Sequence, residues 1–352
     1  MNSHNFFSGS LPRIQAKLEN WWNFGEQEAP CILITLAPQD ADVYEDVPLE
    51  RWWKDRDFII ERQMKLMETQ RYFGEAVPFH YVDCSSSAMA GVLGANMQLV
   101  NRDTMWAYPC FETVEQVIDM PLGRDTFWYA QARSLTERST ALAKDHHFVT
   151  LFAMEGVTDI LAGLYGTENF LADLLEKPQA VKRAMEHVKR LWIELFDEFQ
   201  EILKQTGNRG GIGWAGIWAP GSTFPMQEDF SYMISNRMYR EFVLPHVRDM
   251  VDAMEYPFYH LDGIGAIPHL ESLLEIERLR VIQWIPGAGK ERIGDWYPLI
   301  RRILSAGKSV QAFATAPEVD ELVAEVGTRG LLITVTASEE EAEQLAEKYH
   351  LY

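Results

Sequence analysis

A histidine and an aspartate stand two residues apart in the segment PFYHLDG, as His260 and Asp262. In an extended strand, residues i and i+2 point to the same side, so both side chains can reach one ligand, metal ion or proton. A neutral imidazole and a carboxylate together suit zinc or another divalent metal. Two ligands bind weakly, so a third protein group, which the sequence does not identify, or a substrate oxygen must complete such a site. A hydrogen-bonded pair without a ligand is the alternative.

Three further carboxylates follow apolar segments. Asp83 ends the segment FHYVD, where it can hold a substrate cation or shuttle a proton, or else cap the helix that the next serines begin. Glu155 and Asp159 follow the segment FVTLFA. Either can pair with Asp83 as acid and base, and a surface ion pair is the alternative. We interpret Asp83, Glu155, His260 and Asp262 as candidate catalytic residues.

Four tryptophans can build an aromatic wall for an apolar or sugar-like ligand. They are Trp106, Trp214, Trp218 and Trp284. Gln283 stands beside the last of them and is a candidate neighbour of His260 from the next strand. Together with Asp159 these residues are the predicted substrate-binding set, although aromatic residues also fill protein cores.

Eight short β-type segments position these residues. They are 30–36, 79–83, 148–153, 211–215, 257–261, 280–284, 308–313 and 330–335. Helical patterns such as 170–205 and 237–254 lie between them. Strands that alternate with helices predict a parallel sheet, and eight such units predict a closed (β/α)8 TIM barrel. The candidate residues then converge at the carboxyl ends of the strands, where such barrels carry their active sites.

Two regions lie outside the simple repeat. Residues 1–29 form an N-terminal extension, and residues 96–147 form an insertion between the second and third strands. We interpret the insertion as a short hairpin followed by helix. The chain has no internal repeat or Pro/Gly-rich linker, so we expect residues 1–352 to form one domain.

Charge and cysteine content exclude several classes of function. The 352 residues carry a formal net charge of −20, which disfavours nucleic acid and anionic membranes as partners. The three cysteines form no CxxC pair, which excludes a thiolate zinc knuckle and fits reduced thiols. The first residues lack a secretory pattern and no apolar run is long enough to span a membrane. We therefore expect a cytoplasmic protein that acts on a small molecule, with a homodimer left open.

Several segments, in this order and spacing, are similar to one enzyme superfamily. They are FHYVDCSSSAMAGVLGANMQL, FVTLFAMEGVTDILAGLYG, GIGWAGIWAPGSTFPMQEDFSYMIS with YREFVLPHVRDMV, and GLLITVTASEEEAEQL. The chain resembles, over most of its length, the uroporphyrinogen decarboxylase superfamily, which also contains corrinoid-linked methyltransferases. The resemblance implies a single TIM-barrel domain.

The decarboxylase branch matches only in part. Asp83 stands where these enzymes carry the essential aspartate that binds the pyrrole N–H groups. Their arginine-rich signature after the first strand is replaced by LAPQDAD, with Asp40 and Asp42, and their late histidine is replaced by TVTAS. We therefore expect no useful decarboxylation of uroporphyrinogen, because a polycarboxylate would meet aspartates in place of arginines.

The methyltransferase branch implies a metal site. Its members bind zinc through a His-x-Cys at the end of the fifth strand and a later cysteine. His260-Leu261-Asp262-Gly263 resembles this motif with Asp in place of Cys, and no cysteine follows Cys110. A site rich in oxygen and nitrogen ligands is thus implied, and it suits activation of a methyl ether more than of a thiol.

The expected function is methyl transfer from a small methylated substrate to a corrinoid carried on a partner protein. The first alternative is a decarboxylase-type lyase that acts through Asp83 on a substrate smaller than uroporphyrinogen. A glycosidase-like hydrolase with two carboxylates in a tryptophan-lined cleft is the next, and a non-catalytic binding protein is the last.

Overall fold

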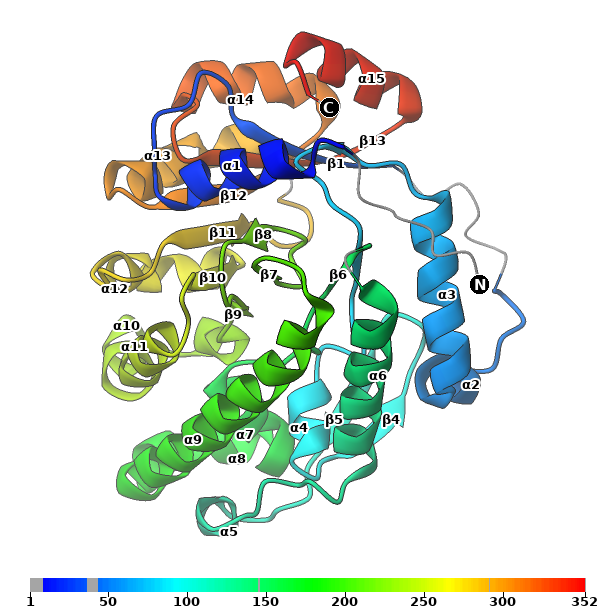
Figure 1. Cartoon of the computed structure of the whole chain (residues 1–352). Coiled ribbons are helices and arrows are strands. Elements are labelled where there is room, and N and C mark those ends of the chain that lie inside the picture. Colours follow the sequence, from blue (N-terminus) through cyan, green and yellow to red (C-terminus); the bar gives the residue numbers. More distant parts are fainter. Residues whose placement is uncertain (1–8, 37–43, 145, 291, 352) are drawn as a thin grey trace.

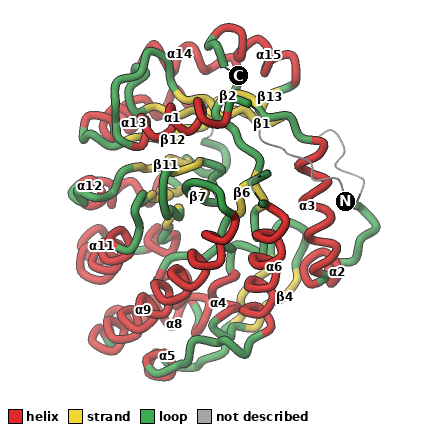
Figure 2. Tube along the Cα trace, viewed as in Figure 1, coloured by secondary structure: helices red, strands yellow, loops and turns green. Residues whose placement is uncertain are grey.

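The structure, a computed structural model, describes residues 9–36, 44–144, 146–290 and 292–351 (Figure 1). Its strands are β1 (Cys31–Leu36), β2 (Phe73–Gly74), β3 (Phe79–His80), β4 (Asn96–Leu99), β5 (Met105–Tyr108), β6 (Phe148–Val149), β7 (Gly211–Ile212), β8 (Trp218–Ala219), β9 (Pro225–Met226), β10 (Phe258–Asp262), β11 (Val281–Ile285), β12 (Ser309–Ala314) and β13 (Leu331–Ala337). Helices form the outer layer around these strands (Figure 2).

The α-helices are α1 (Leu11–Trp22), α2 (Leu49–Lys54), α3 (Arg56–Thr69), α4 (Ala88–Val92), α5 (Val114–Ile118), α6 (Phe127–Ala143), α7 (Val157–Tyr165), α8 (Thr167–Glu176), α9 (Pro178–Leu203), α10 (Asn236–Met238), α11 (Leu244–Asp252), α12 (Leu270–Leu274), α13 (Tyr297–Ser305), α14 (Val319–Val326) and α15 (Glu339–Lys348). Short 3₁₀ and π-helical elements are η1 (Lys204–Thr206), η2 (Asp229–Met233), η3 (Tyr239–Val243), η4 (Ile264–His269), η5 (Ile293–Trp296) and η6 (Ala316–Glu318). All of these are 3₁₀ turns except η3, which is a π-helical turn.

The main sheet is mostly parallel and has the order β2-β1-β13-β12-β11-β10-β9. The first predicted strand and the last pair in parallel along their length, from Cys31 opposite Leu332 to Leu36 opposite Ala337. Strands β9 to β13 follow one another in chain order, each parallel to the next, with helical segments between them. The expected α/β class with a parallel sheet is therefore confirmed.

Closure into an eight-stranded barrel is not seen in the hydrogen bonding of the described residues. The second and third predicted strands shorten to β3 and β6, which pair only with each other. The fourth prediction, 211–215, is only partly right, because Gly211–Ile212 form a strand, but this strand pairs antiparallel with β8, and the parallel neighbour of β10 is β9. The closed barrel stays a prediction.

The extension and the insertion behave as their sequences indicate. In the extension, α1 carries Trp21 and Trp22 into a buried cluster with the first residues of several strands, such as Phe258 and Val281. This helix therefore covers the amino ends of the strands. In the insertion, β4 and β5 form an antiparallel hairpin, which α5 and α6 follow.

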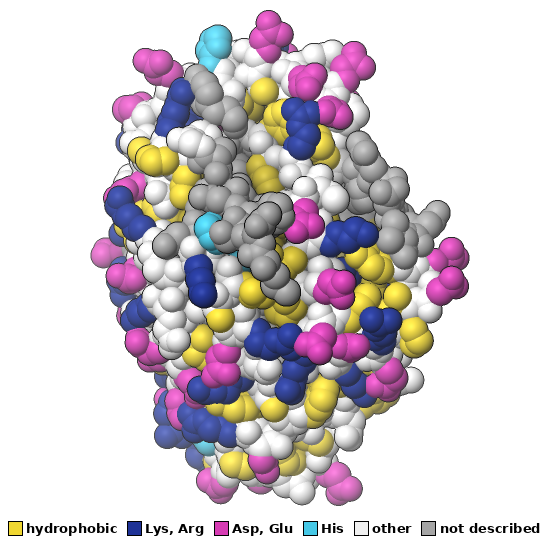
Figure 3. Space-filling view, turned by 45° about the vertical axis from the view of Figure 1, so that its right-hand side comes forward, with side chains coloured by type: hydrophobic (Ala, Val, Ile, Leu, Met, Phe, Trp, Pro, Cys, Tyr) yellow, Lys and Arg dark blue, Asp and Glu magenta, His cyan; other side chains and the backbone are white. Residues whose placement is uncertain are grey.

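The surface mixes charges of both signs. On the face drawn in Figure 3, lysines and arginines are interspersed with aspartates and glutamates, and apolar side chains lie among them. Among the described helices, none combines the length and the apolar character that crossing a membrane requires.

Candidate functional site

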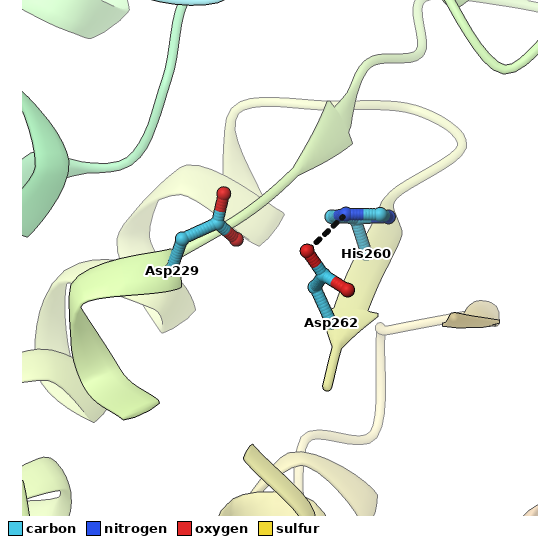
Figure 4. Close-up of side chains that lie close together, drawn as sticks. All are labelled: Asp229, His260 and Asp262. Atoms are coloured by element: carbon cyan, nitrogen blue, oxygen red, sulfur yellow. Dashed lines mark ion pairs between the residues drawn. The ribbon is translucent and has the colours of Figure 1, made fainter. Parts of the chain in front are cut away.

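Three side chains converge beyond the carboxyl end of β10. His260 and Asp262 project from the same face of this strand, and Asp229 reaches them from the first residue of η2 (Figure 4). One ligand atom from each of the three residues lies within 4.8 Å of the others. His260 Nε2 lies 3.8 Å from Asp262 Oδ2. We call these three residues the His-Asp-Asp triad.

A row of hydrogen bonds across four strands fixes the imidazole of His260. Its Nδ1 contacts Gln283 Oε1 of β11. Gln283 Nε2 donates to Gln311 Oε1 of β12 at 2.6 Å, and Gln311 Nε2 donates to Thr334 Oγ1 of β13 at 2.9 Å. An amide oxygen only accepts, so it selects the tautomer with hydrogen on Nδ1. The lone pair of Nε2 is then free to face the two aspartates, which is the arrangement that metal-binding histidines require.

The surroundings of His260 favour positive charge near the triad. Burial of the ring opposes its protonation, but Asp262, Asp229 and Gln283 outweigh burial and raise the pKa of His260. The rings of Trp214 and His260 pack in a T-shaped arrangement with their centroids 5.1 Å apart. A divalent cation would meet one nitrogen and two carboxylate oxygens, a donor set that fits zinc and other borderline metals. Asp262 remains 40% exposed, which leaves an open side for a substrate.

A reciprocal pair of carboxylate caps positions Asp229. Asp159, from α7, accepts hydrogen bonds from the backbone N–H groups of Asp229 at 3.0 Å and Phe230 at 2.7 Å. Glu228, in turn, accepts from the first two N–H groups of α7, those of Val157 at 3.0 Å and Thr158 at 2.9 Å. Each segment therefore satisfies the free N–H groups at the start of the other, which holds α7 and η2 in one relative position.

Gly156 makes this close approach possible. A Cβ at this position would lie 2.0 Å from the backbone oxygen of Gln227 and 2.7 Å from the carboxylate of Glu228. Only a residue without a side chain fits. Gln227 also contacts Asp229 through its side chain, because Gln227 Nε2 donates a hydrogen bond to Asp229 Oδ2 at 2.9 Å.

Glu155 is a buried carboxyl group beside the triad. The residue is only 7% exposed, and Oε2 accepts a hydrogen bond from the N–H of Ala90 at 2.9 Å. Burial raises the pKa of Glu155 to about 8, against the opposing effect of the Ala90 hydrogen bond. Its backbone has a φ of 50°, in the left-handed region that residues other than glycine rarely adopt.

We expect Glu155→Gln to stabilise the metal-free protein at alkaline pH and not at pH 5. The folded-state pKa lies above the unfolded value of 4.5, so the wild type loses stability as the pH rises from about 4.5 to about 8. Each pKa unit corresponds to about 1.4 kcal/mol, so the difference between the two proteins at pH 8.5 is on the order of a few kcal/mol. Urea unfolding at both pH values measures it. Parallel pH profiles of the two proteins would contradict the prediction.

The remaining predicted residues are divided between the site and the core. Trp106 lines a cavity of about 620 Å³ together with Glu155, Asp159 and Asp229. Asp83 accepts a hydrogen bond from the N–H of Ser85 at 2.9 Å, and burial raises its pKa while nearby Arg62 opposes this. Asp83 is not among the residues that line this cavity. Asp40 and Asp42 lie outside the described residues.

Two of the four tryptophans lie away from the triad. Trp218 is buried in the cluster at the amino ends of the strands, where its N–H donates to Arg209 O at 2.8 Å. Trp284 packs against Trp296, on the opposite face of β11 from Gln283. The expectation that these two rings lie at the carboxyl mouth is wrong. Adjacent strand residues face opposite ways, so Gln283 and Trp284 cannot share one site.

Asp229 is the site residue that sequence reasoning missed. It follows Pro225–Met226, a strand of two residues that is too short to show a periodic pattern. The available signal was the acidic pair Glu228-Asp229 in the segment PMQEDF, which stands before a helical stretch.

Comparisons with known proteins agree with the architecture. No protein-family model matches the chain, and no curated protein sequence matches it. The fold of the chain is similar to the folds of solved structures. One of these structures is a methyltransferase from Methanosarcina mazei, which matches with a TM-score of 0.66 over 96% of this chain and 98% of that chain, at 8% sequence identity. At this identity the likeness concerns the fold alone.

Proposed function

We propose that the protein is a metal-dependent methyltransferase that moves a methyl group from a small methylated substrate to a corrinoid on a partner protein. The observation that carries the proposal is the convergence of His260, Asp262 and Asp229 beside a cavity. The fold likeness to a methyltransferase supports it. We also propose that the fold is a (β/α)8 barrel, in which the described sheets are parts of one distorted ring. A cytoplasmic location is part of the same proposal.

The residues of the chain have separate tasks in this proposal. A divalent ion held by the triad supplies Lewis acidity toward an ether oxygen of the methyl donor. Gln283 holds the imidazole of His260 with Nε2 toward the aspartates. Asp159 and Glu228 fix the segment that carries Asp229, and the cavity wall holds the body of the substrate. Preorganisation of this kind removes the need to rearrange ligands when substrate enters.

The test is formation of methylcobalamin. The purified protein is incubated with zinc, free cob(I)alamin and one methyl donor at a time, from a panel of methoxylated aromatics, O-methyl sugars and methylated ammonium compounds. We expect zinc-dependent formation of methylcobalamin with at least one donor class, and its loss on addition of a chelator. Activity that persists without metal would contradict a role for the triad as a metal site.

A glycosidase-like hydrolase is the second candidate, and one observation favours it. Glu155 and Asp159 lie in the same cavity as Trp106, and Glu155 has a pKa of about 8, which suits a general acid. Hydrolysis of alkyl glycosides, whose leaving group needs a proton, would favour this function over methyl transfer if Glu155→Gln abolished it.

A further inference from the structure

The cavity beside the triad is built mainly from three elements. It has a volume of about 620 Å³ and lies between the β4–β5 hairpin, helix α7 and η2. Its wall carries three carboxylates, Glu155, Asp159 and Asp229, and two exposed aromatic rings, Trp106 and Tyr108. Asp229 belongs to both the cavity and the triad, so an occupant of the cavity lies next to the proposed metal site.

Two carboxylates of this cavity, Glu155 and Asp159, have no cationic partner in the described part of the chain, whereas Asp229 also faces His260 of the triad. No lysine, arginine or histidine is among the lining residues. Glu155 is 7% exposed and accepts a hydrogen bond from the backbone of Ala90, and Asp159 accepts only from backbone N–H groups. Neither forms an ion pair with a described side chain. Removing a carboxylate from water without a counter-charge is costly, so these groups favour an occupant that brings positive charge.

The two aromatic rings of the cavity wall are exposed to solvent. Trp106 is 58% exposed and Tyr108 is 45% exposed, although large aromatic side chains usually bury most of their surface. The face of an indole or phenol ring attracts cations, and rings of this kind recognise quaternary ammonium groups. An alkylammonium group also has apolar methyl or methylene surface, which suits the methyl side chains of Ala107 and Ala162 in the same wall.

We propose that this cavity binds an organic ammonium cation, with Glu155, Asp159 and Asp229 supplying the negative charge and Trp106 an aromatic face. The inference rests on the proposed function in one respect, since it takes the cation to be part of the methylated substrate. The substrate class is then a methyl donor that carries an alkylammonium group.

The test uses two ligands of the same shape and different charge. Choline carries a trimethylammonium group, and 3,3-dimethylbutan-1-ol has a neutral carbon in place of the nitrogen. Binding of each to the metal-free protein is measured by isothermal titration calorimetry at constant ionic strength and at pH 8.5, where the Glu155 carboxyl group is ionised. We expect choline to bind at least about tenfold more tightly than the neutral alcohol, because only choline gains the carboxylate and cation–π attraction. Equal affinities, or no binding of choline, would overturn the proposal.

Variants locate the bound cation. Trp106→Leu and Glu155→Gln are each expected to weaken choline binding about fivefold or more. Phe127→Leu is the matched control, because Phe127 is a comparably exposed aromatic residue, at 47%, on α6 and outside the cavity wall. Choline binding that both cavity variants leave unchanged would place the cation elsewhere and overturn the proposal, even where the wild type prefers choline.

A zinc titration of the same preparations separates this inference from the proposed function. Choline selectivity that depends on Trp106 and Glu155 supports the cavity proposal whether or not zinc binds. Zinc binding without choline selectivity overturns the cavity proposal and leaves the methyltransferase proposal standing.

Discussion

The His260→Ala variant is expected to lose its divalent metal while it keeps its fold. The side chain supplies the single nitrogen ligand of the triad, and the two aspartates alone form a weak pair of oxygen ligands. Removal of a group that only orients a ligand typically costs about 10- to 100-fold in metal affinity, so loss of the ligand itself should cost at least about 100-fold. The measurement is zinc content after dialysis, with affinity from a competitive chelator titration.

Stability is measured alongside, because a structural role for His260 would affect it. The substitution leaves Gln283 Oε1 without a partner, which costs about 1–3 kcal/mol and lowers the midpoint of thermal unfolding by a few degrees only. Asp262→Asn should also weaken zinc binding. His187→Ala is the control, since this histidine on α9 hydrogen-bonds to Met120 O and to Arg190 and is not part of the triad. A wild type that binds no metal, together with a His260→Ala variant that no longer folds, would show that His260 and Asp262 form only a structural hydrogen bond.

The Gly156→Ala variant is expected to lose both stability and metal affinity. The added methyl group would meet the Gln227 oxygen at 2.0 Å, and backbone cannot move aside as a flexible side chain can. Overpacking of this kind costs about 1–3 kcal/mol, and the clash here should reach the upper end of that range. Because Glu228 and Asp229 follow Gln227 directly, the same displacement moves a triad ligand. Zinc affinity should therefore fall by about tenfold or more.

Gly294→Ala provides the comparison for this variant. A Cβ at Gly294 would find its nearest neighbour, Arg292 Nε, at 3.6 Å, which is ordinary contact. Urea unfolding and zinc titration of both variants give the two readouts. A Gly156→Ala protein with normal zinc affinity and reduced stability would show that the contact between α7 and η2 does not position Asp229.

Alternation along strands made part of the site predictable. The i, i+2 spacing placed His260 and Asp262 on one face of a strand, and the structure confirms that their ligand atoms lie together. The segments around β1 and β10 to β13 were predictable because each is a short run of mainly apolar residues between helical patterns. These runs gain stability from burial on both faces, so their composition alone identifies them.

The rest depended on contacts that composition does not encode. GIGWA has the composition of a strand, yet only Gly211 and Ile212 pair, and they pair with β8. Strand β9 has two residues, so nothing periodic marks it or the Asp229 that follows. The strand that contains Trp284 was predicted correctly, but the face of the strand on which Trp284 lies was not. Whether Gln283 or Trp284 points inward depends on the register of β11 with β12. Register is a property of the assembled sheet.

The pairing of β1 with β13 also constrains how the chain folds during synthesis. These strands are joined by hydrogen bonds between residues about 300 positions apart, and the adjoining Thr328 Oγ1 donates to Gln27 O across 301 positions. The segment Cys31–Leu36 therefore leaves the ribosome long before its partner exists and must wait, with an open apolar edge, until almost the whole chain has emerged. Contacts of such long range slow folding and prolong exposure to aggregation, so this protein should depend on chaperones more than its composition suggests. Pulse-labelled chains that end before residue 331 should stay protease-sensitive in this first strand, and full-length chains should protect it.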